Sequence, residues 1–352
     1  MSPDLWELYR QMLRSRLFEE AVALLWHEGL ISGEMHLGTG EEAVYAGVVS
    51  HLSDGDAMAV DHRGTAPLLM RGVDPVLLMR EFLGRADGLC GGAGGHMHLF
   101  APEKLAASSG IVGASGPTAA GFALAATHLR PGKLAVSFSG EGTMNQGMML
   151  EALNLAAAWH LPVVFVCRDN GWAISSRSAG LTGGTPRDRA RGFGLPAVSV
   201  DGLDVAAVWR AAGEACERAR SGGGPGFIHA TCVHRDGHFL GDQLLRTARR
   251  PAAEMPRVAG PMLRSAVRPR GLPVTQRLAG MLYLTGLSGE VAAQTSDAKD
   301  PVKHTRRQLV GDLQRLEGLE AAVLAETQQV VDRALAEAGP ESSGSAGAGQ
   351  EG

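Results

Sequence analysis

Two residues with the chemistry of cation ligands follow two apolar segments of the chain. Glu141 follows the apolar run 134–139 and one glycine, and Asn170 comes shortly after a second apolar run at residues 163–167. Carboxylate and carboxamide oxygens are hard ligands of the kind that Mg²⁺ prefers, and protein-bound Mg²⁺ commonly bridges to phosphate. The two side chains therefore indicate a magnesium site next to a phosphate group, provided that the fold brings them together.

The elements that must position these side chains form a strand–helix–strand unit. Residues 134–139 and 163–167 predict buried strands, and residues 144–158 carry apolar side chains at helical spacing. Such a crossover is right-handed and leaves its two strands parallel, so both strands end at the same edge of the sheet. Glu141 and Asn170 are then expected side by side at the edge where open α/β sheets bind ligands.

Gly142 and Thr143 follow Glu141 and break the strand pattern before the predicted helix. Their backbone N–H groups would lie at a helix N-terminus, which is a ready site for phosphate. An ordinary strand–helix–strand unit with a polar turn and a helix cap fits the same residues, because glycine turns after strands are common. The residue pattern by itself leaves both interpretations open.

The two turns resemble the thiamine diphosphate motif, which reads Gly-Asp-Gly and, further along, Asn-Asn. Here Gly140-Glu141-Gly142 stands at the first place and Asp169-Asn170 at the second, with Asn170 29 positions after Glu141. The similarity extends over the run GEGTMNQGMMLEALNLAAAWHLPVVFVCRDNGWAIS. This run is similar to the alpha subunits of the 2-oxo acid dehydrogenases, a family that includes pyruvate, branched-chain and acetoin dehydrogenases.

The resemblance implies the fold and the organisation of the chain. It covers residues 5–242 and resumes at residues 300–301. The implied fold is the α/β thiamine diphosphate-binding fold, a central mostly parallel sheet with helices on both faces, here with a C-terminal helical extension. The chain then divides into a diphosphate- and magnesium-binding α/β domain (1–243), an atypical insertion of unknown role (244–299), a C-terminal helical segment (300–338) and a disordered tail (339–352).

The resemblance also implies which residues hold the cation. In the family, the acidic residue of the motif, its last Asn and a backbone carbonyl two residues later hold Mg²⁺, and these positions are Glu141, Asn170 and Trp172. Glu141 replaces the usual Asp and adds one methylene, and Asp169 replaces the first Asn. Because Mg²⁺ requires near-octahedral geometry, the longer side chain must be accommodated by a shift of the turn or by a different coordination.

Several further positions are implied to contact the cofactor. His62-Arg63 stands where the family has Tyr-Arg, and that Arg binds the diphosphate, for which a planar guanidinium fork is well suited. The element at residues 109–114 matches one whose backbone touches the pyrimidine ring. The implied cofactor-binding residues are Arg63, His62, Gly110, Val112, Gly140, Gly142, Thr143, Asn170 and His238.

Two histidines match family positions close to the cofactor. His238 belongs to a Gly-His pair, and His36 begins an element similar to His-Leu-x-x-Gly-Gln-Glu-Ala. We expect both to transfer protons or to stabilise developing negative charge, as histidines that titrate near neutrality can. His96 and His98 have the spacing of a metal-binding pair, but the family's Gly-Gly-Ser-Met-His occupies this place without a metal.

The run Gly-His-Phe-x-Gly-Asp at residues 237–242 is most similar to the acetoin dehydrogenase branch. In the family, a second domain holds the aminopyrimidine and supplies a glutamate. No segment of this sequence resembles that domain, so the resemblance implies a separate beta subunit and an α₂β₂ assembly. The implied reaction cleaves a 2-oxo acid or an acyloin such as acetoin and passes the acyl group to a lipoyl acyltransferase. Two alternatives stay open: a carboligase or acyl transferase subunit of a biosynthetic pathway, and a regulatory subunit without catalytic activity.

The composition and charge of the chain argue against several classes of protein. The formal net charge is −4 and there is no long basic run, which argues against nucleic-acid binding. The 4 cysteines lie far apart without a CxxC pair and predict buried thiols in a reducing compartment. The sequence has no run of about 18 uncharged apolar residues that would predict a membrane span, and its N-terminus does not resemble a signal peptide. We therefore expect a cytoplasmic protein that binds no nucleic acid and no membrane.

The remaining elements are predicted from periodicity, caps and turn residues. Residues 175–191 are polar and glycine-rich and predict a mobile loop. Further strands are expected at residues 57–60, 197–200 and 227–232, and further helices at residues 5–28, 117–129, 205–220 and 313–338, with another helix starting at Asp74-Pro75.

Overall fold

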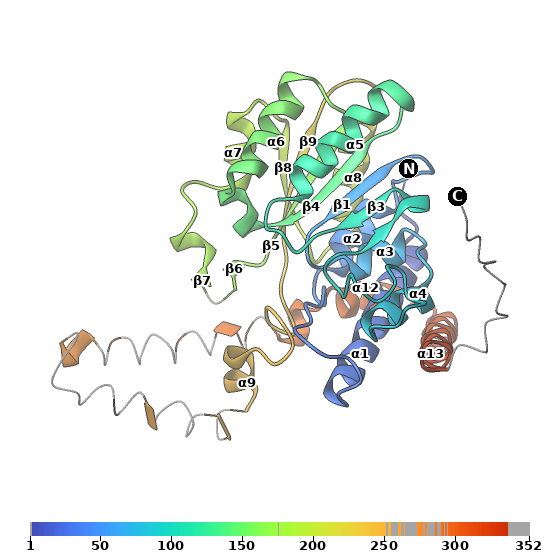
Figure 1. Ribbon diagram of the computed structural model, residues 1–352, viewed down its shortest axis with the longest axis vertical. Coiled ribbons are helices and arrows are strands. Elements are labelled where there is room, and N and C mark those ends of the chain that lie inside the picture. Colours follow the sequence, from blue (N-terminus) through green and yellow to red (C-terminus); the bar gives the residue numbers. More distant parts are fainter. Residues whose placement is uncertain are drawn as a thin grey trace, which may run out of the picture.

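A seven-stranded sheet forms the centre of the computed structural model of the protein, which describes residues 2–174, 176–250 and 295–336 and scattered positions between residues 253 and 293 (Figure 1). In spatial order the strands are β2 (Phe100–Ala101), β3 (Ala106–Ser108), β1 (Ala57–Val60), β4 (Ala135–Gly140), β5 (Val163–Asp169), β9 (Gly226–Thr231) and β8 (Ala197–Asp201). Neighbouring strands are parallel except for β2 and β3, which pair antiparallel. The predicted α/β class with a mostly parallel sheet is confirmed.

Helices lie on both sides of this sheet (Figure 1). One side holds α1 (Leu5–His27), α2 (Glu42–Val49), α3 (Thr65–Met70), α4 (Pro75–Phe82) and α8 (Val205–Arg220). The other side holds α5 (Ser115–Leu129), α6 (Gly147–Ala158) and α7 (Pro186–Gly192). Because both faces are buried, the central strands are near-continuous apolar runs, as expected of a parallel sheet.

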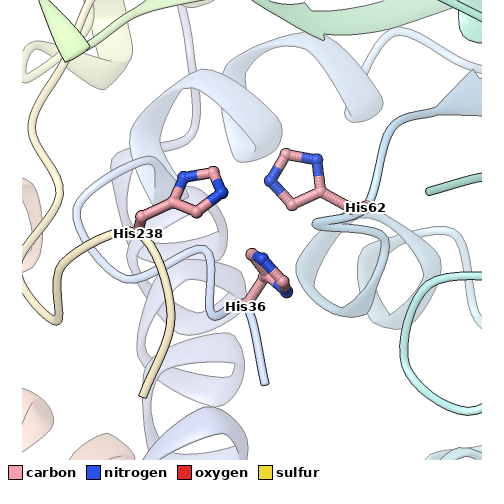
Figure 2. Close-up of side chains that lie close together, drawn as sticks. All are labelled: His36, His62 and His238. Carbon is pink, nitrogen blue, oxygen red and sulfur yellow. The ribbon is translucent and has the colours of Figure 1, made fainter. Parts of the chain in front are cut away.

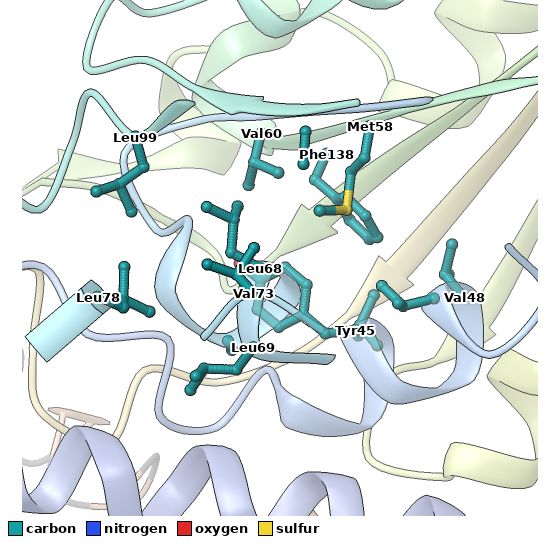
Figure 3. Close-up of a cluster of buried hydrophobic side chains, with 14 of the residues drawn as sticks. Tyr45, Val48, Met58, Val60, Leu68, Leu69, Val73, Leu78, Leu99 and Phe138 are labelled. Atoms are coloured by element: carbon teal, nitrogen blue, oxygen red, sulfur yellow. The ribbon is translucent and has the colours of Figure 1, made fainter. Parts of the chain in front are cut away.

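Strand β4 shows how the sequence serves both faces, since successive side chains of a strand point to opposite sides. Val136 and Phe138 pack into one cluster, together with Tyr45 from α2 (Figure 3). Ala135 packs into a second cluster with residues of α5 and α6. Burial on both faces fixes the register of β4 against β5, in which Gly140 stands opposite Arg168. The two strands therefore end at the same level of the sheet.

The chain returns to this domain after residue 299. Helices α12 (Pro301–Leu309) and α13 (Leu313–Leu335) pack against α1. Asp300 accepts hydrogen bonds from the backbone N–H groups at the start of α12, and its carboxylate also lies 3.1 Å from the Arg16 guanidinium of α1. The predicted C-terminal helical extension is confirmed.

Much of the predicted insertion at residues 244–299 lies outside the described residues, as does the predicted tail at residues 339–352. The described parts of the insertion include most of α9 (Gln243–Arg249) and the 3₁₀ turn η4 (Asp297–Lys299). The division of the chain into four parts therefore stays a prediction.

Two local predictions differ from the structure. The helix after β4 begins at Gly147 rather than at residue 144, because Glu141–Asn145 forms a 3₁₀ turn, η2. The predicted loop at residues 175–191 contains β7 (Ser176–Arg177), the 3₁₀ turn η3 (Ser178–Gly180) and most of α7. The expectation of an irregular loop is wrong there, because Thr185 caps α7 by accepting the N–H of Asp188 and a proline follows at the first helical position.

The remaining predicted helices and strands occur within a few residues of their expected bounds. A short antiparallel hairpin joins β6 (Trp172–Ala173) to β7 at the end of β5. The four cysteines are free thiols; Cys167, Cys216 and Cys232 are buried, and Cys90 is half-buried. None of the helices in the described part of the chain has the length and apolarity to cross a membrane.

Candidate functional site

A cavity of about 260 Å³ lies at the carboxyl ends of the parallel strands. Its lining includes Glu41 before α2 and Arg168 of β5, and the rest comes mainly from the ends of β1, β3, β4, β5 and β9 and the segments that follow them. These segments contribute Asp61, His62 and Arg63; Ile111 and Val112; Gly140, Glu141, Gly142 and Thr143; Asn170, Trp172 and Ile174; and His234 and His238. The prediction that Glu141 and Asn170 lie at one edge of the sheet is confirmed.

Two predicted site residues do not line this cavity. Gly110 is absent from its wall, although the adjacent Ile111 and Val112 belong to it. His36 lies behind the wall, where its ring packs edge-on against the rings of His62 and His238. The structure brings the other predicted positions together, and their roles as ligands stay predictions.

The alternation of side chains at the end of β5 separates two neighbouring polar residues. Arg168 and Asn170 face the cavity, and Asp169 between them faces the other way. The Asp169 carboxylate lies 2.7 Å from Nε2 of His229 on β9 and lines a second cavity. Asp169 is therefore a partner of His229 in the sheet, which accounts for an acid where the related motif has Asn.

Glu141 is a buried carboxyl whose side-chain hydrogen-bond partner, among the described residues, is Ser178. Its side chain is 2% exposed, and Oε1 accepts a 2.5 Å hydrogen bond from the hydroxyl of Ser178 in η3. Burial raises the pKa of Glu141 to about 7, and the hydrogen bond from Ser178 offsets only part of this rise. A cation beside this carboxyl would reverse the effect of burial by favouring the charged form.

Asn170 is oriented by two contacts. Its Oδ1 accepts a hydrogen bond from the backbone N–H of Trp172 at 2.9 Å, and its Nδ2 lies 2.8 Å from Nε2 of His234. The same His234 nitrogen lies 2.7 Å from Oε1 of Glu41. His234 therefore lies between the amide of Asn170 and a buried acid, and sequence reasoning did not identify this position.

A buried network of ion pairs forms the wall behind Asn170. Arg168 is 1% exposed and donates to the carboxylates of Glu41 and Asp61 and to the hydroxyl of Tyr45. Burial opposes ionisation of both acids, but the guanidinium outweighs it and holds the pKa of Glu41 and that of Asp61 below their usual range. One sequence signal was available, because a single arginine within a buried apolar strand requires buried counter-charges.

Arg63 is a second buried cation, and it is bound differently. Its guanidinium donates to the carbonyl oxygens of Leu37 and His238 and lies 3.1 Å from Nδ1 of His234. Within the described ranges of the chain, Arg63 forms no ion pair with a carboxylate. A buried charge without a counter-ion is costly, so Arg63 favours an anion in the adjoining cavity.

Three histidine rings, those of His36, His62 and His238, meet (Figure 2), and the His238 ring lies beside Arg63. Burial lowers the pKa of His36 to about 2, with further lowering by His62 and Arg63. Burial also lowers the pKa of His62 to about 3 and that of His238 to about 4, and Arg63 acts in the same direction on both. The expectation that His36 and His238 titrate near neutrality is therefore wrong for this chain by itself, and both rings are neutral at pH 7.

A glycine allows the two loops that carry His36 and His238 to approach each other. Gly40 has a φ of +99°, and a Cβ there would collide with the carbonyl oxygen of Val233. The backbone of residues 38–40 therefore packs directly against residues 233–235.

The site fits a magnesium ion and a phosphate group by the chemistry of its donors. A carboxylate, a carboxamide and the backbone of Trp172 border one cavity, and the neighbouring cation Arg63 lacks a described acidic partner. Gly142 and Thr143 belong to η2 rather than to the N-terminus of α6, which corrects the predicted helix-end site. A Cβ on Gly142 would lie 3.3 Å from Cβ of Ala173, so the turn fits closely against β6.

Comparison with known proteins agrees with this geometry. The chain matches the family described as dehydrogenase E1 component over residues 10–260. It is 46% identical over 237 residues to the alpha subunit of acetoin:2,6-dichlorophenolindophenol oxidoreductase of Cupriavidus necator, which covers 67% of this chain and 71% of that protein. The alpha subunit of the same name from Bacillus subtilis is 43% identical over 240 residues, with 68% of this chain and 72% of that protein covered.

A relative with a different name is similar over a longer range. The pyruvate dehydrogenase E1 component subunit alpha of Zymomonas mobilis is 35% identical over 302 residues, which covers 84% of this chain and 83% of that protein. The resemblance to alpha subunits of the 2-oxo acid dehydrogenases is thereby confirmed. The chain belongs to the family of dehydrogenase E1 components.

Proposed function

We propose that this chain is the alpha subunit of a heterotetrameric, thiamine diphosphate-dependent dehydrogenase and holds the diphosphate and Mg²⁺ of the cofactor. One observation carries the proposal: the ends of neighbouring parallel strands direct a carboxyl, a carboxamide and a buried arginine without a described acidic partner at one cavity. Membership of the E1 family implies thiamine diphosphate as the cofactor and a beta subunit as the partner.

Each polar group at the cavity then has a task. Glu141, Asn170 and the backbone carbonyl of Trp172 would hold Mg²⁺, which takes oxygen ligands. Arg63 and the N–H groups of Gly142 and Thr143 would hold the diphosphate. The other cofactor contacts are assigned to His62, Gly110, Val112, Gly140 and His238.

Thiamine diphosphate, when bound, supplies the electron sink for cleavage of the bond beside a ketone. His238 is a neutral imidazole in the cavity wall, so it can accept a proton or donate a hydrogen bond to an oxygen on which negative charge develops, and His36, behind the wall, would act through its contact with His238. Burial of this part of the site excludes water and strengthens such hydrogen bonds.

The substrate is proposed to be an acyloin such as acetoin or a small 2-oxo acid, because the relatives are named for acetoin and for pyruvate. The acyl group would pass to a lipoyl group of a separate acyltransferase. The beta subunit would supply the domain that holds the pyrimidine ring. A cytoplasmic location stays a prediction.

The test is to purify the full chain with a co-encoded beta-like subunit and to titrate the complex calorimetrically with thiamine diphosphate and Mg²⁺. Reduction of dichlorophenolindophenol is then followed with acetoin and with pyruvate. We expect binding that needs both ligands, and loss of binding in Arg63→Gln but not in Arg130→Gln, which changes an exposed arginine at the end of α5.

No binding of the cofactor by the complex would rule the proposal out. Product analysis separates the remaining readings. A ligated product that forms without a lipoyl acceptor would identify a carboligase, and cofactor binding without turnover of either substrate would favour a regulatory subunit.

A further inference from the structure

Three histidines from three different segments form a compact cluster beside the cavity. His36 lies in the segment after α1, His62 follows β1 and His238 follows β9. One ring nitrogen from each can be chosen so that all three nitrogens lie within 4.8 Å of one another. In Figure 2, a ring nitrogen of His62 and one of His238 face each other, with the His36 ring next to both. We call these residues the histidine trio.

Two observations indicate which ring nitrogens of the trio are available for a ligand. Nε2 of His62 is buried and has no hydrogen-bond partner among the described residues. Nδ1 of His36 lies 2.8 Å from Nε2 of His96, so a ligand at the trio would use Nε2 of His36. An unpaired buried nitrogen is unfavourable, and a ligand that accepts its lone pair would remove the penalty.

We propose that the histidine trio is a binding site for a divalent transition-metal ion, for which Zn²⁺ is the best fit. Three imidazole nitrogens without a carboxylate are typical ligands of Zn²⁺ and of similar ions such as Co²⁺. Mg²⁺ prefers oxygen, so the site is distinct in its chemistry from the one formed by Glu141 and Asn170.

The geometry requires a modest closing of the three rings. With Zn–N bonds of about 2.0–2.1 Å in a tetrahedral arrangement, ligand nitrogens stand roughly 3.4 Å apart, so distances of up to 4.8 Å in the trio must shorten by up to about 1.4 Å. Rotation of the side chains can provide this. The contact between His36 and His96 acts as the outer partner that orients a metal-bound imidazole, and three protein ligands leave one position for water.

A bound ion would oppose loading of the cofactor, and this consequence rests on the proposed function. His62 and His238 line the cavity that would receive the diphosphate, and metal coordination would fix both rings in a new position. Since coupling between two ligands is reciprocal, Zn²⁺ and thiamine diphosphate should weaken each other's binding by the same factor.

Arg63 offers an independent way to test the site. Its Nη2 lies 3.5 Å from Nδ1 of His238, so its positive charge opposes a dication in the trio. Removal of this charge should tighten Zn²⁺ binding while it weakens binding of the diphosphate. A variant with opposite effects on two ligands cannot be explained by general loss of structure.

The experiment uses the complex of the full chain with its beta-like partner after treatment with a chelator. Zn²⁺ is titrated calorimetrically, and Co²⁺ serves as a spectroscopic probe of tetrahedral nitrogen ligation. We expect one ion per chain, roughly 10–100-fold weaker binding in His62→Gln and in His36→Gln, and tighter binding in Arg63→Gln. His128→Gln, which changes an exposed histidine on α5, should leave Zn²⁺ binding unchanged.

Equal Zn²⁺ binding by wild type and the two trio variants would overturn the site, as would an equal loss in His128→Gln. If Zn²⁺ binds at the trio but thiamine diphosphate never binds, the metal site stands and the proposed function fails. If the cofactor binds and Zn²⁺ does not, the reverse holds. Independent binding of both would disprove the antagonism.

Discussion

Two buried acids in the wall of the cavity, Glu41 before α2 and Glu141 after β4, have opposite protonation behaviour. Glu41 and Glu141 are both almost completely buried, yet the pKa of Glu41 lies far below its usual range while burial raises the pKa of Glu141 to about 7. The difference is a permanent counter-charge. Arg168 lies against Glu41, whereas the side-chain partner of Glu141 among the described residues is the neutral Ser178 hydroxyl.

The buried acids in the two walls of the cavity therefore have different kinds of partner. In the wall of Glu41, Arg168 and Asp61, both acids have a counter-charge within the protein, and that arginine is anchored in the central strand β5. At the Glu141 wall the acid forms no ion pair with a described residue, and its partner Ser178 belongs to a three-residue turn. We infer that the first wall is prearranged by folding and that the second is completed by a dissociable cation.

Removal of the permanent counter-charge should have the largest effect. Arg168→Met leaves the carboxylates of Glu41 and Asp61 buried without their cation, which should lower the free energy of unfolding by about 3–5 kcal/mol. Urea unfolding followed by circular dichroism measures this loss. Arg306→Met removes an arginine from a partly exposed pair with Glu320, and it should cost about 1 kcal/mol or less. Equal losses in the two variants would contradict the comparison.

Glu141 should make the stability of the chain depend on pH in the absence of a cation. Its pKa rises from 4.5 to about 7 on folding. Below pH 4.5 the carboxyl is protonated in both states and contributes nothing. As pH rises from there to 7, the unfolded chain ionises first, so stability falls and then levels off.

Glu141→Gln removes this dependence. Relative to wild type, the variant should gain roughly 2–3 kcal/mol of unfolding free energy between pH 5 and pH 8, measured by urea unfolding in metal-free buffer. Mg²⁺ should restore stability to the wild type at pH 8 and have no effect on the variant. A difference between the two proteins that does not change with pH would show that Glu141 is already ionised in the free chain.

His234 contacts both Glu41 and Asn170, and its removal should lower stability by less than Arg168→Met does. His234→Ala takes away the partner of Glu41 and the contact with the Asn170 amide, at a cost of about 1–3 kcal/mol. It should also weaken Mg²⁺ binding roughly 10–100-fold, as loss of an outer partner of a metal ligand does.

A second histidine separates these two effects of the His234 variant. His51→Ala removes a ring that contacts the Trp209 carbonyl away from the cavity, so it should lower stability without changing the affinity for Mg²⁺. If both variants weaken the binding of Mg²⁺ equally, His234 has no positioning role.

These two walls also differ in how far the sequence predicts them. Glu141 and Asn170 were found because each directly follows a buried strand, and parallel strands end at one edge. The pairing of Arg168 with Glu41 joins residues 127 positions apart, and nothing in local spacing indicates which acid a buried arginine selects. The effect of Ser178 was missed for a similar reason, since the turn that places its hydroxyl on Glu141 follows from the hairpin β6–β7.

The histidines show a further limit of sequence reasoning. Their positions were predicted from matching motifs, and the structure does bring His36 and His238 together. Their protonation was not predicted correctly, because the pKa of a histidine depends on burial and on neighbouring charges such as Arg63, which come from other segments of the chain.

The smallest effect is expected when the Ser178 hydroxyl is removed, and this change tests the Glu141 wall most directly. Ser178 donates to the Glu141 carboxylate and so favours its charged form. Ser178→Ala should therefore raise the pKa of Glu141 further, and protons should then compete better with Mg²⁺. We expect a two- to three-fold loss of Mg²⁺ affinity at pH 7, no loss at pH 9 where the acid is ionised in both proteins, and a stability change within about 1 kcal/mol.

The control is Ser176→Ala, which changes an exposed serine two positions earlier and should have no effect. Tighter Mg²⁺ binding by Ser178→Ala at both pH values would mean that the hydroxyl competes with the cation for the carboxylate. In the free chain, Glu141 would then have Ser178 as a partner that Mg²⁺ must displace. The two walls would differ because the partner of Glu141 is exchangeable and that of Glu41, Arg168, is permanent.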